Sequence, residues 1–483
     1  MTEHTPEHVD VLIVGAGLSG IGAACRLRTD HPERSVAVLE GRDVSGGTWD
    51  LFRYPGIRSD SDMFTFGYKW RHWDGDVALA DGPSILEYLR TVAREYGVDR
   101  LIRYRHRVVS ASWSSDEDRW TVEVDRDGER LTLTTDLLWA CGGYYDYDQG
   151  FSPDFPGQED FAGTIVHPQH WPEDLDYTGK KVVIIGSGAT AVTLVPAMAD
   201  SGAGHVTMLQ RSPTYILSLP GTDPVSKWLH WLPAKVRYPI VRWKAILSSI
   251  AFFQLSRRRP QMVKDFIRKE AVKQLPKDVD VDRHFKPAYN PWDQRVCFVP
   301  DGDLFKAMRR GAASVVTDHV ERFTEKGILL RSGQELEADV VVTATGLTLK
   351  AMGGLRLSVD GAEVKMHDTM TYKALMLSDV PNFVFTIGYT NASWTLKADL
   401  VADFVCRLLT YLDEHGVRRV VAPRDPSVGE ERLIDFSSGY ILRGLDALPR
   451  QGDREPWKLR QNYLTDLRSI NHDRIDDGVL SFR

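Results

Sequence analysis

The sequence predicts an α/β fold in which one βαβ domain is inserted into another, with a helical segment added to the inserted domain. The first observation is that an apolar strand, a glycine turn and a helical pattern occur in this order twice, from residue 9 and again from residue 181. The second is that two apolar strands end in glycine, at 137–143 and 340–346, and divide the chain between these units. The third is that residues 227–269 have a helical, basic composition. Alternation of strands and helices is typical of parallel α/β sheets.

Both units carry the glycine pattern of a Rossmann-like dinucleotide-binding domain. The glycines allow a tight turn and let the backbone approach a pyrophosphate at a helix N-terminus. One such pattern is weak evidence, but here the strand, turn, helix and second strand are present in both places. The expected nucleotide contacts are Gly15, Gly17, Ser19 and Gly20 in the first unit, and Gly186, Ser187, Gly188, Ala189, Thr190, Ala191 and Val192 in the second.

The residue that closes each unit distinguishes the two nucleotides. Glu40 stands twenty positions after Gly20, where a carboxylate accepts hydrogen bonds from ribose hydroxyls and repels a 2′-phosphate. Arg211, preceded by Gln210, stands twenty positions after Ala191, where a guanidinium pairs with a 2′-phosphate. We therefore expect FAD in the first unit and NADPH in the second.

The two strands that end in glycine set the expected domain limits. The chain leaves the first domain near residue 145, builds the second, and returns near residue 339, after which a strand at 383–387 and a helix from Trp394 complete the first domain. The expected FAD-binding domain is therefore in two parts, 1–145 and 339–483 with the C-terminal region, around an NADP-binding domain at 146–338 that has a helical insertion at about 222–295.

Composition limits the class of protein. The 483 residues carry a net charge of −7, so nucleic acid, which selects basic proteins, is not an expected partner. Residues 1–10 show no secretory signal, and no apolar run approaches the roughly 20 residues that span a membrane, which favours a cytoplasmic protein. No metal site, disulfide or dithiol redox pair is expected from the four scattered cysteines, Cys25, Cys141, Cys297 and Cys406.

The basic segment 227–269 has two interpretations. It holds eleven Lys and Arg residues against one acid, Asp265, with aromatic residues between them. The favoured interpretation is a solvated basic face over a substrate tunnel. The alternative is peripheral association with an anionic membrane surface, which basic amphipathic helices can provide.

Further motifs resemble those of Baeyer–Villiger monooxygenases, within the flavin monooxygenase superfamily. Residues 161–172, FAGTIVHPQHWP, match the FxGxxxHxxxWP signature, where related N- and S-oxygenating enzymes usually have Tyr in place of Trp171. A second family pattern runs from Gly46-Gly47-Thr48-Trp49 to Asp60. The similarity extends over nearly the whole chain and is greatest to the ethionamide-activating ketone monooxygenases of mycobacteria, in RYPGIRSDSDM, HPQHWPEDLDY, YNPWDQR and GYTNASWTLKADL.

The resemblance implies roles for particular residues. It makes Arg295 the catalytic arginine, whose permanent charge stabilises a C4a-peroxyflavin and the oxyanion of its adduct, and it makes Asp60 the group that orients Arg295. Gln294 stands where some relatives have a lysine, so recognition of the 2′-phosphate would depend more on Arg211. His167 would position the interdomain linker. The other implied contacts are Thr48, Trp49, Asp50 and Leu51 at the flavin, Val108 at the adenine, and Arg58, Ser59 and Asp60 at the nicotinamide.

The expected activity follows from the two fingerprints and the resemblance together. It is the NADPH- and O₂-dependent conversion of ketones to esters or lactones, with oxidation of sulfur-containing substrates as a side activity. One rival is an N- or S-oxygenating flavin monooxygenase. A more distant rival is a redox module that binds FAD without oxygenating a substrate.

Overall fold

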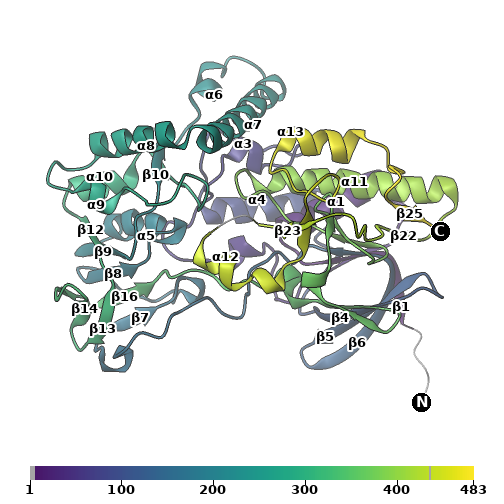
Figure 1. Cartoon of the computed structure of the whole chain (residues 1–483), viewed down its shortest axis with the longest axis horizontal. Coiled ribbons are helices and arrows are strands. Elements are labelled where there is room, and N and C mark those ends of the chain that lie inside the picture. The colour runs from purple at the N-terminus through teal and green to yellow at the C-terminus, as the bar shows by residue number, and fades with distance from the viewer. Residues whose placement is uncertain (1–5, 435–436) are drawn as a thin grey trace.

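The computed structural model describes residues 6–434 and 437–483. Residues 1–5, which belong to the N-terminal stretch considered above for a signal, and residues 435–436 lie outside the described residues. The chain forms two α/β lobes, each built on its own sheet, with a group of helices at the top of Figure 1 and the C-terminal segment running across the first lobe. This arrangement confirms the predicted α/β fold with a helical insertion.

The first sheet is assembled from both ends of the chain. Its nine described strands have the order β18-β17-β4-β5-β6-β1-β2-β3, and β21 also pairs with β6. Strands β1, β2, β3, β6 and β21 are mutually parallel where they pair, while β4, β5 and β6 form an antiparallel meander. Their bounds are β1 Glu7–Val14, β2 Val36–Leu39, β3 Ile102–Arg103, β4 Arg107–Ser114, β5 Arg119–Arg126, β6 Glu129–Ala140, β17 Arg356–Val359, β18 Ala362–Val364 and β21 Phe383–Phe385.

The second sheet is formed entirely by the intervening chain. It has five parallel strands in the order β12-β9-β8-β16-β7 within the described residues. Their bounds are β7 Thr164–Val166, β8 Lys181–Ile185, β9 His205–Gln210, β12 Ala313–Thr317 and β16 Val340–Thr343. Because β16 pairs with β7 and β8, the chain returns to the first sheet after Thr343, and the limit expected at residue 339 is too early.

Helices cover the sheets and bury their apolar faces. Helices α1 (Leu18–Asp30), α4 (Gly82–Glu95) and α11 (Trp394–His415) bury their apolar residues on one face of the first sheet. Helices α5 (Ala189–Asp200) and α10 (Asp303–Arg309) cover one face of the second sheet, and the meander β13 (Val320–Thr324), β14 (Gly327–Leu330) and β15 (Glu335–Glu337) covers the other. Burial of these apolar faces is the main stabilising contribution.

The predicted insertion is helical. It contains α6 (Pro224–Trp228), α7 (Ala234–Arg258), α8 (Pro260–Gln274) and α9 (Val281–His284), between the paired strands β10 (Ile216–Leu219) and β11 (Cys297–Pro300). Pro260 ends α7 and occupies the first position of α8, where a proline needs no hydrogen-bond partner. No helix in residues 6–434 or 437–483 combines the length and apolar character needed to cross a bilayer.

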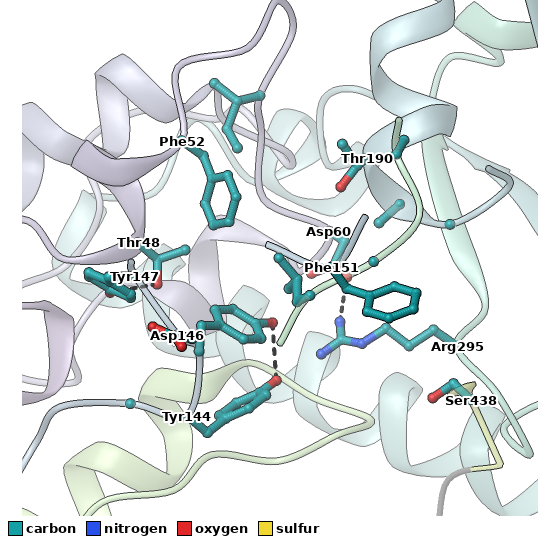
Figure 2. A pocket seen from close by; sticks show the side chains of 18 of the residues that line it. Thr48, Phe52, Asp60, Tyr144, Asp146, Tyr147, Phe151, Thr190, Arg295 and Ser438 are labelled. Carbon is teal, nitrogen blue, oxygen red and sulfur yellow. Dashed lines mark hydrogen bonds and ion pairs between the residues drawn. The ribbon is translucent and has the colours of Figure 1, made fainter. Parts of the chain in front are cut away.

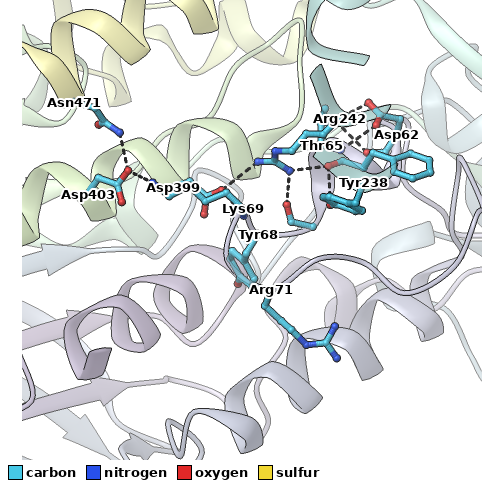
Figure 3. A network of polar contacts seen from close by, with 12 residues as sticks. Asp62, Thr65, Tyr68, Lys69, Arg71, Tyr238, Arg242, Asp399, Asp403 and Asn471 are labelled. Atoms are coloured by element: carbon cyan, nitrogen blue, oxygen red, sulfur yellow. Dashed lines mark hydrogen bonds and ion pairs between the residues drawn. The ribbon is translucent and has the colours of Figure 1, made fainter. Parts of the chain in front are cut away.

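Helix α7 is attached to the first lobe by a buried polar network (Figure 3). Arg242 donates hydrogen bonds to the carbonyl oxygens of Phe64 and Gly67, at 2.7 Å each, and to Asp399 of α11 at 3.3 Å. Lys69 donates its backbone N–H to Asp399 at 2.9 Å. The insertion is therefore held in one orientation against α11.

Short elements complete the described chain. They are α2 Thr48–Leu51, α3 Met63–Phe66, β19 Thr371–Tyr372, β20 Met376–Leu377, β22 Val420–Val421, β23 Glu430–Arg432, α12 Gly439–Arg443, β24 Arg450–Gly452, α13 Tyr463–Asp466 and β25 Ser481–Phe482.

Candidate active site

A cavity of about 990 Å³ lies between the two lobes and reaches both fingerprints (Figure 2). This volume is at the upper end of the roughly 300–1,000 Å³ typical of ligand pockets. Most of the residues expected from the sequence line it: Gly15, Gly17, Ser19, Glu40, Thr48, Trp49, Arg58, Ser59, Asp60, Val108, Gly186, Ser187, Gly188, Ala189, Thr190, Val192, Arg211 and Arg295. The structure thus brings together groups from both lobes and from the insertion.

The two strands that end in glycine cross directly over the two fingerprints. A Cβ atom at Gly15 would lie 2.8 Å from the Cys141 carbonyl oxygen, and one at Gly186 would lie 2.3 Å from the Ala344 carbonyl oxygen. Both glycines also have positive φ, +103° and +142°. Only glycine accommodates such a close backbone approach, so each crossing segment is held at the mouth of a fingerprint.

At the first fingerprint, the N-terminus of α1 and Glu40 form one wall of the cavity. Glu40 is buried and accepts hydrogen bonds from the backbone N–H of Ala16 at 2.8 Å and of Arg42 at 3.0 Å. Burial raises the pKa of Glu40, and these two backbone donors oppose the shift. Ser19 accepts a hydrogen bond from the indole of Trp394 at 2.8 Å, which joins the first turn of α1 to the N-terminus of α11.

At the second fingerprint, the N-terminus of α5 is open to the cavity. A Cβ atom at Gly188 would meet nothing within 4 Å, so there is room for a ligand group in front of the helix. Arg211 lines the cavity, is exposed, and makes no ion pair within the described parts of the chain. Tyr54 hydrogen-bonds Thr190, and burial raises the pKa of Tyr54 to about 12.

Arg295 and Asp60 meet inside the cavity, although 235 positions separate them in the sequence. Arg295 Nη1 donates to Asp60 Oδ2 at 2.6 Å, with Phe151 beside them (Figure 2). Arg58 makes a comparable bond to Asp303 of α10 at 2.6 Å. These pairs attach the segment 58–60 of the first lobe to the second lobe and its insertion.

The turn that presents Arg295 is strained and well packed. Trp292 has φ +70°, a conformation that is costly for a bulky residue. Asn290 donates its N–H to the Asp293 carboxylate at 3.0 Å, and Asp293 donates its N–H to the Asn290 carbonyl oxygen at 3.0 Å. The Trp292 ring is buried against Phe252 and Phe253 of α7, with centroids 6.4 and 5.7 Å away. Packing against the insertion therefore holds the turn.

Five of the expected residues lie behind the cavity wall instead of lining it: Gly20, Asp50, Leu51, Ala191 and Gln210. Gly20 packs against the Gly15 carbonyl oxygen, and Ala191 is fully buried in the core of the second lobe. Asp50 is buried and accepts hydrogen bonds from Arg42 at 2.6 Å and Arg90 at 2.9 Å.

Leu51 packs partly buried against the core of the second lobe. The Gln210 side chain donates hydrogen bonds to the His284 carbonyl oxygen and to Thr317, and it does not line the cavity. Asp50 and Leu51 of the short helix α2 therefore do not line the cavity with their side chains, and their expected contact with the flavin stays a prediction.

Several lining residues were not expected from the sequence. They are mainly aromatic and come from the crossing segment and the C-terminal region: Tyr144, Tyr145, Tyr147, Phe151, Tyr389, Trp394, Ser438 and Arg443. The Tyr144 ring stacks on Trp394 with centroids 5.4 Å apart, and Tyr147 lies 3.2 Å from the Thr48 hydroxyl. The aromatic residues that follow Gly143 could have indicated this part of the cavity from the sequence. No local sequence pattern indicates that Ser438 lines it.

The cysteines and His167 have structural environments. All four cysteines are free and buried, and burial raises the pKa of Cys141 and Cys297 to about 12, so these thiols stay protonated. His167 packs over Gly150 in the linker, and burial lowers its pKa.

Unpaired polar atoms at the cavity fit the two expected nucleotides. Arg58 Nη2 and Ser438 Oγ are buried without a hydrogen-bond partner among residues 6–434 and 437–483, and both residues line the cavity. Unpaired buried donors of this kind call for a ligand acceptor. Together with the N-termini of α1 and α5, which both reach the cavity, they suit ligands rich in phosphate and carbonyl oxygens.

The comparisons with known proteins agree with this geometry. A family model for flavin-binding monooxygenase-like proteins matches residues 78–376, and a model for the NAD(P)-binding Rossmann-like domain matches residues 13–75. The chain therefore belongs to the flavin-binding monooxygenase-like family. The predictions of an FAD- and NADP-dependent monooxygenase and of the fold are confirmed.

Individual relatives cover nearly the whole chain. FAD-containing monooxygenase EthA of Mycobacterium tuberculosis is 56% identical over 99% of this chain and 98% of its own length. Probable FAD-binding monooxygenase AlmA of Acinetobacter baylyi is 50% identical over 99% and 96%. Among solved structures, an oxidized steroid monooxygenase bound to NADP is 25% identical with a TM-score of 0.71, covering 87% of this chain and 88% of that one. An open structure of cyclohexanone monooxygenase, at 21% identity and a TM-score of 0.73, covers 87% and 90% and shares the fold.

Proposed function

We propose that this protein uses NADPH and O₂ to convert ketones to esters or lactones, with oxidation of sulfur-containing substrates as a side activity. The observation that carries the proposal is the Arg295–Asp60 pair, 2.6 Å apart, inside a cavity that also reaches both nucleotide fingerprints. Ketone plus O₂, NADPH and H⁺ gives ester, NADP⁺ and water. One oxygen atom enters between the carbonyl carbon and a substituent, and the other leaves as water. For a thioether, the same balance gives a sulfoxide.

The residues of this chain would hold the two nucleotides at opposite ends of the cavity. The N-terminus of α1 and Glu40 would bind the pyrophosphate and ribose of FAD. The N-terminus of α5 and Arg211 would bind the pyrophosphate and 2′-phosphate of NADPH. When bound, FAD supplies the two-electron chemistry that links NADPH oxidation to O₂. The N-terminus of α11, which reaches the cavity through Trp394, would place its positive end toward negative charge on the reduced flavin.

Arg295 would stabilise negative charge that develops on the substrate's carbonyl oxygen. A guanidinium keeps its proton at working pH, so this stabilisation is constant. Asp60 would orient the guanidinium through the 2.6 Å hydrogen bond. Phe151 and Trp394 line the same cavity and would exclude water from the reacting groups.

Arg295→Ala tests the proposal directly. The purified parent protein should be yellow and should convert simple ketones to esters with NADPH and air, as measured by gas chromatography. The variant should keep its flavin and lose at least about 100-fold in ester formation, the usual effect of removing one charge-stabilising group. The matched control is Arg356→Ala, which removes an exposed arginine on β17. Ester formation retained by the Arg295 variant would refute its role, and peroxide as the sole product of the parent across a broad ketone panel would refute the function.

Paired ketone and thioether substrates separate the proposal from its first rival. Trp171, where N- and S-oxygenating relatives usually have Tyr, favours the ketone activity. An S-oxygenating enzyme would give only sulfoxide from the mixture, whereas the proposed enzyme gives ester as well. The non-oxygenating module would consume NADPH at a rate that added substrate does not change.

A further inference from the structure

Most of the large apolar side chains that the described chain exposes to solvent belong to the helical insertion. Ten of the thirteen such residues in the described chain lie between Trp228 and Val272, on or next to helices α6, α7 and α8. We call this set the outer face of α6–α8: Trp228, Trp231, Val236, Ile240, Trp243, Leu247, Leu255, Met262, Phe266 and Val272. Trp228 and Trp231 are 74% and 69% exposed. Exposed apolar side chains concentrated in one segment of the chain indicate an interaction site.

Helix α7 is apolar on two opposite sides. Its inner side buries Val241, Ala245 and Ile246. Its outer side carries a stripe at spacings of three, four or eight residues: Val236, Ile240, Trp243, Leu247 and Leu255. A helix that is apolar all round is normally covered all round. The fold covers the inner side of α7 and leaves the stripe in water.

The polar network of Figure 3 fixes which side of α7 faces outward. Arg242 is buried, and its hydrogen bonds to the Phe64 and Gly67 carbonyl oxygens and to Asp399 prevent rotation about the helix axis. The stripe therefore faces outward permanently, because α7 cannot rotate to bury it in the core.

The charge of this segment is opposite to that of the rest of the chain. Residues 227–269 carry eleven basic residues and one acid, a net +10, whereas the whole chain has −7, so the remainder has −17. Six of the basic residues make no ion pair within the described residues: Lys227, Lys235, Arg258, Arg259, Lys264 and Lys269. Segment 227–269, which carries most of the outer face of α6–α8, thus combines exposed apolar side chains with unneutralised positive charge.

We propose that the outer face of α6–α8 docks the protein on the surface of an anionic bilayer, an interaction beyond the oxygenation proposed above. Tryptophan prefers the boundary between headgroups and acyl chains, and the exposed Trp228, Trp231 and Trp243 would enter it. Each Lys or Arg near an anionic surface adds about 1 kcal/mol of attraction. No described helix can span a bilayer, so the chain lies on the surface without crossing it.

Vesicle flotation of the full-length, FAD-loaded protein tests the proposal. Mixed phosphatidylcholine–phosphatidylglycerol vesicles are compared with pure phosphatidylcholine vesicles. The parent should float with the anionic vesicles and not with the neutral ones. Trp228→Ser with Trp231→Ser should weaken binding at least about tenfold. Lys235→Glu with Arg258→Glu should weaken it by about thirtyfold or more, since each charge is worth about 1 kcal/mol.

Matched variants elsewhere control for exposure and charge. Leu442→Ser removes an exposed leucine of α12, and Lys326→Glu with Arg356→Glu reverses two exposed charges outside the insertion. Both controls should float like the parent, and flavin absorbance and Tm should show that all variants fold. Flotation needs no turnover, so its result is independent of the enzyme assay.

Three outcomes would overturn the proposal. The first is that the parent does not float, or floats equally with neutral vesicles. The second is that both paired variants bind like the parent. The third is that light scattering shows a dimer which the tryptophan pair dissociates, while flotation is absent. That last result would assign the outer face of α6–α8 to a second copy of this chain, whose remaining surface is acidic.

Discussion

Replacing Arg242 by methionine would remove the guanidinium that attaches α7 to the first lobe. In the parent, Arg242 satisfies the carbonyl oxygens of Phe64 and Gly67 and lies 3.3 Å from Asp399, which is itself buried. Burial raises the pKa of Asp399 to about 6, and the positive charge of Arg242 is the main effect that opposes this. Without Arg242, the buried carboxylate loses its principal counter-charge.

The cost of this substitution depends on pH. The pKa of Asp399 is about 6 in the folded protein and about 3.9 when unfolded, so stability falls as pH rises between these values. In the Arg242→Met variant the pKa of Asp399 in the folded protein rises further. The free energy of unfolding therefore continues to fall above pH 6. At pH 8, breaking a buried pair costs about 3–5 kcal/mol. At pH 5, where Asp399 is protonated, only the two carbonyl bonds are lost, about 1–2 kcal/mol.

Calorimetry of the FAD-loaded protein measures how much stability Arg242→Met loses at each pH. With about 2.1 cal/mol/K of unfolding entropy per residue, a chain of this length loses about 1 °C for each kcal/mol if it unfolds cooperatively. Tm of Arg242→Met should therefore fall by about 3–5 °C at pH 8 and by about 1–2 °C at pH 5. Arg258→Met, on the exposed end of the same helix, should change Tm by less than about 1 °C. Equal losses at both pH values would refute the reasoning about Asp399.

Three further variants test the cavity and its support. Arg211→Gln should raise KM for NADPH about 10–100-fold and leave KM for NADH unchanged, because it removes a charged bond to the 2′-phosphate; equal changes for both nucleotides would contradict this. Asp60→Ala should lower kcat for ester formation about tenfold or more with flavin retained, because Arg295 loses its partner at 2.6 Å; an unchanged kcat would contradict the orienting role. Lys397→Met should destabilise the protein by about 3–5 kcal/mol, since the buried Asp466 loses a partner at 2.8 Å; a Tm like that of the parent would refute this.

Features encoded by neighbouring residues could be predicted from the sequence. The fingerprints depend on a strand, a glycine turn and a helix within about 30 residues, so Gly15, Gly188 and Glu40 were identified from spacing alone. The strands at 137–143 and 340–346 were also identified locally, because each is an apolar run that ends directly in glycine. That each crossing passes over a fingerprint could not be predicted, because it depends on how β6 and β16 pair with distant strands.

Contacts between distant residues required the resemblance or the structure. Arg295 and Asp60 are 235 positions apart, and no local pattern joins them. Asp50 was placed at the flavin by its motif, but its side chain turns toward Arg42 and Arg90. The direction of one side chain on a four-residue helix depends on such partners, which the sequence does not reveal.

The way the chain is threaded between the two sheets determines the order in which the lobes can form during synthesis. All strands of the second sheet lie between residues 164 and 343, so that lobe is complete once this stretch has left the ribosome. The first sheet begins at residue 7 but waits for β17 and β21, which end at residue 385. The nascent N-terminal strands must therefore stay unfinished, with the edges of β4 and β6 unprotected, while the inserted lobe folds beside them.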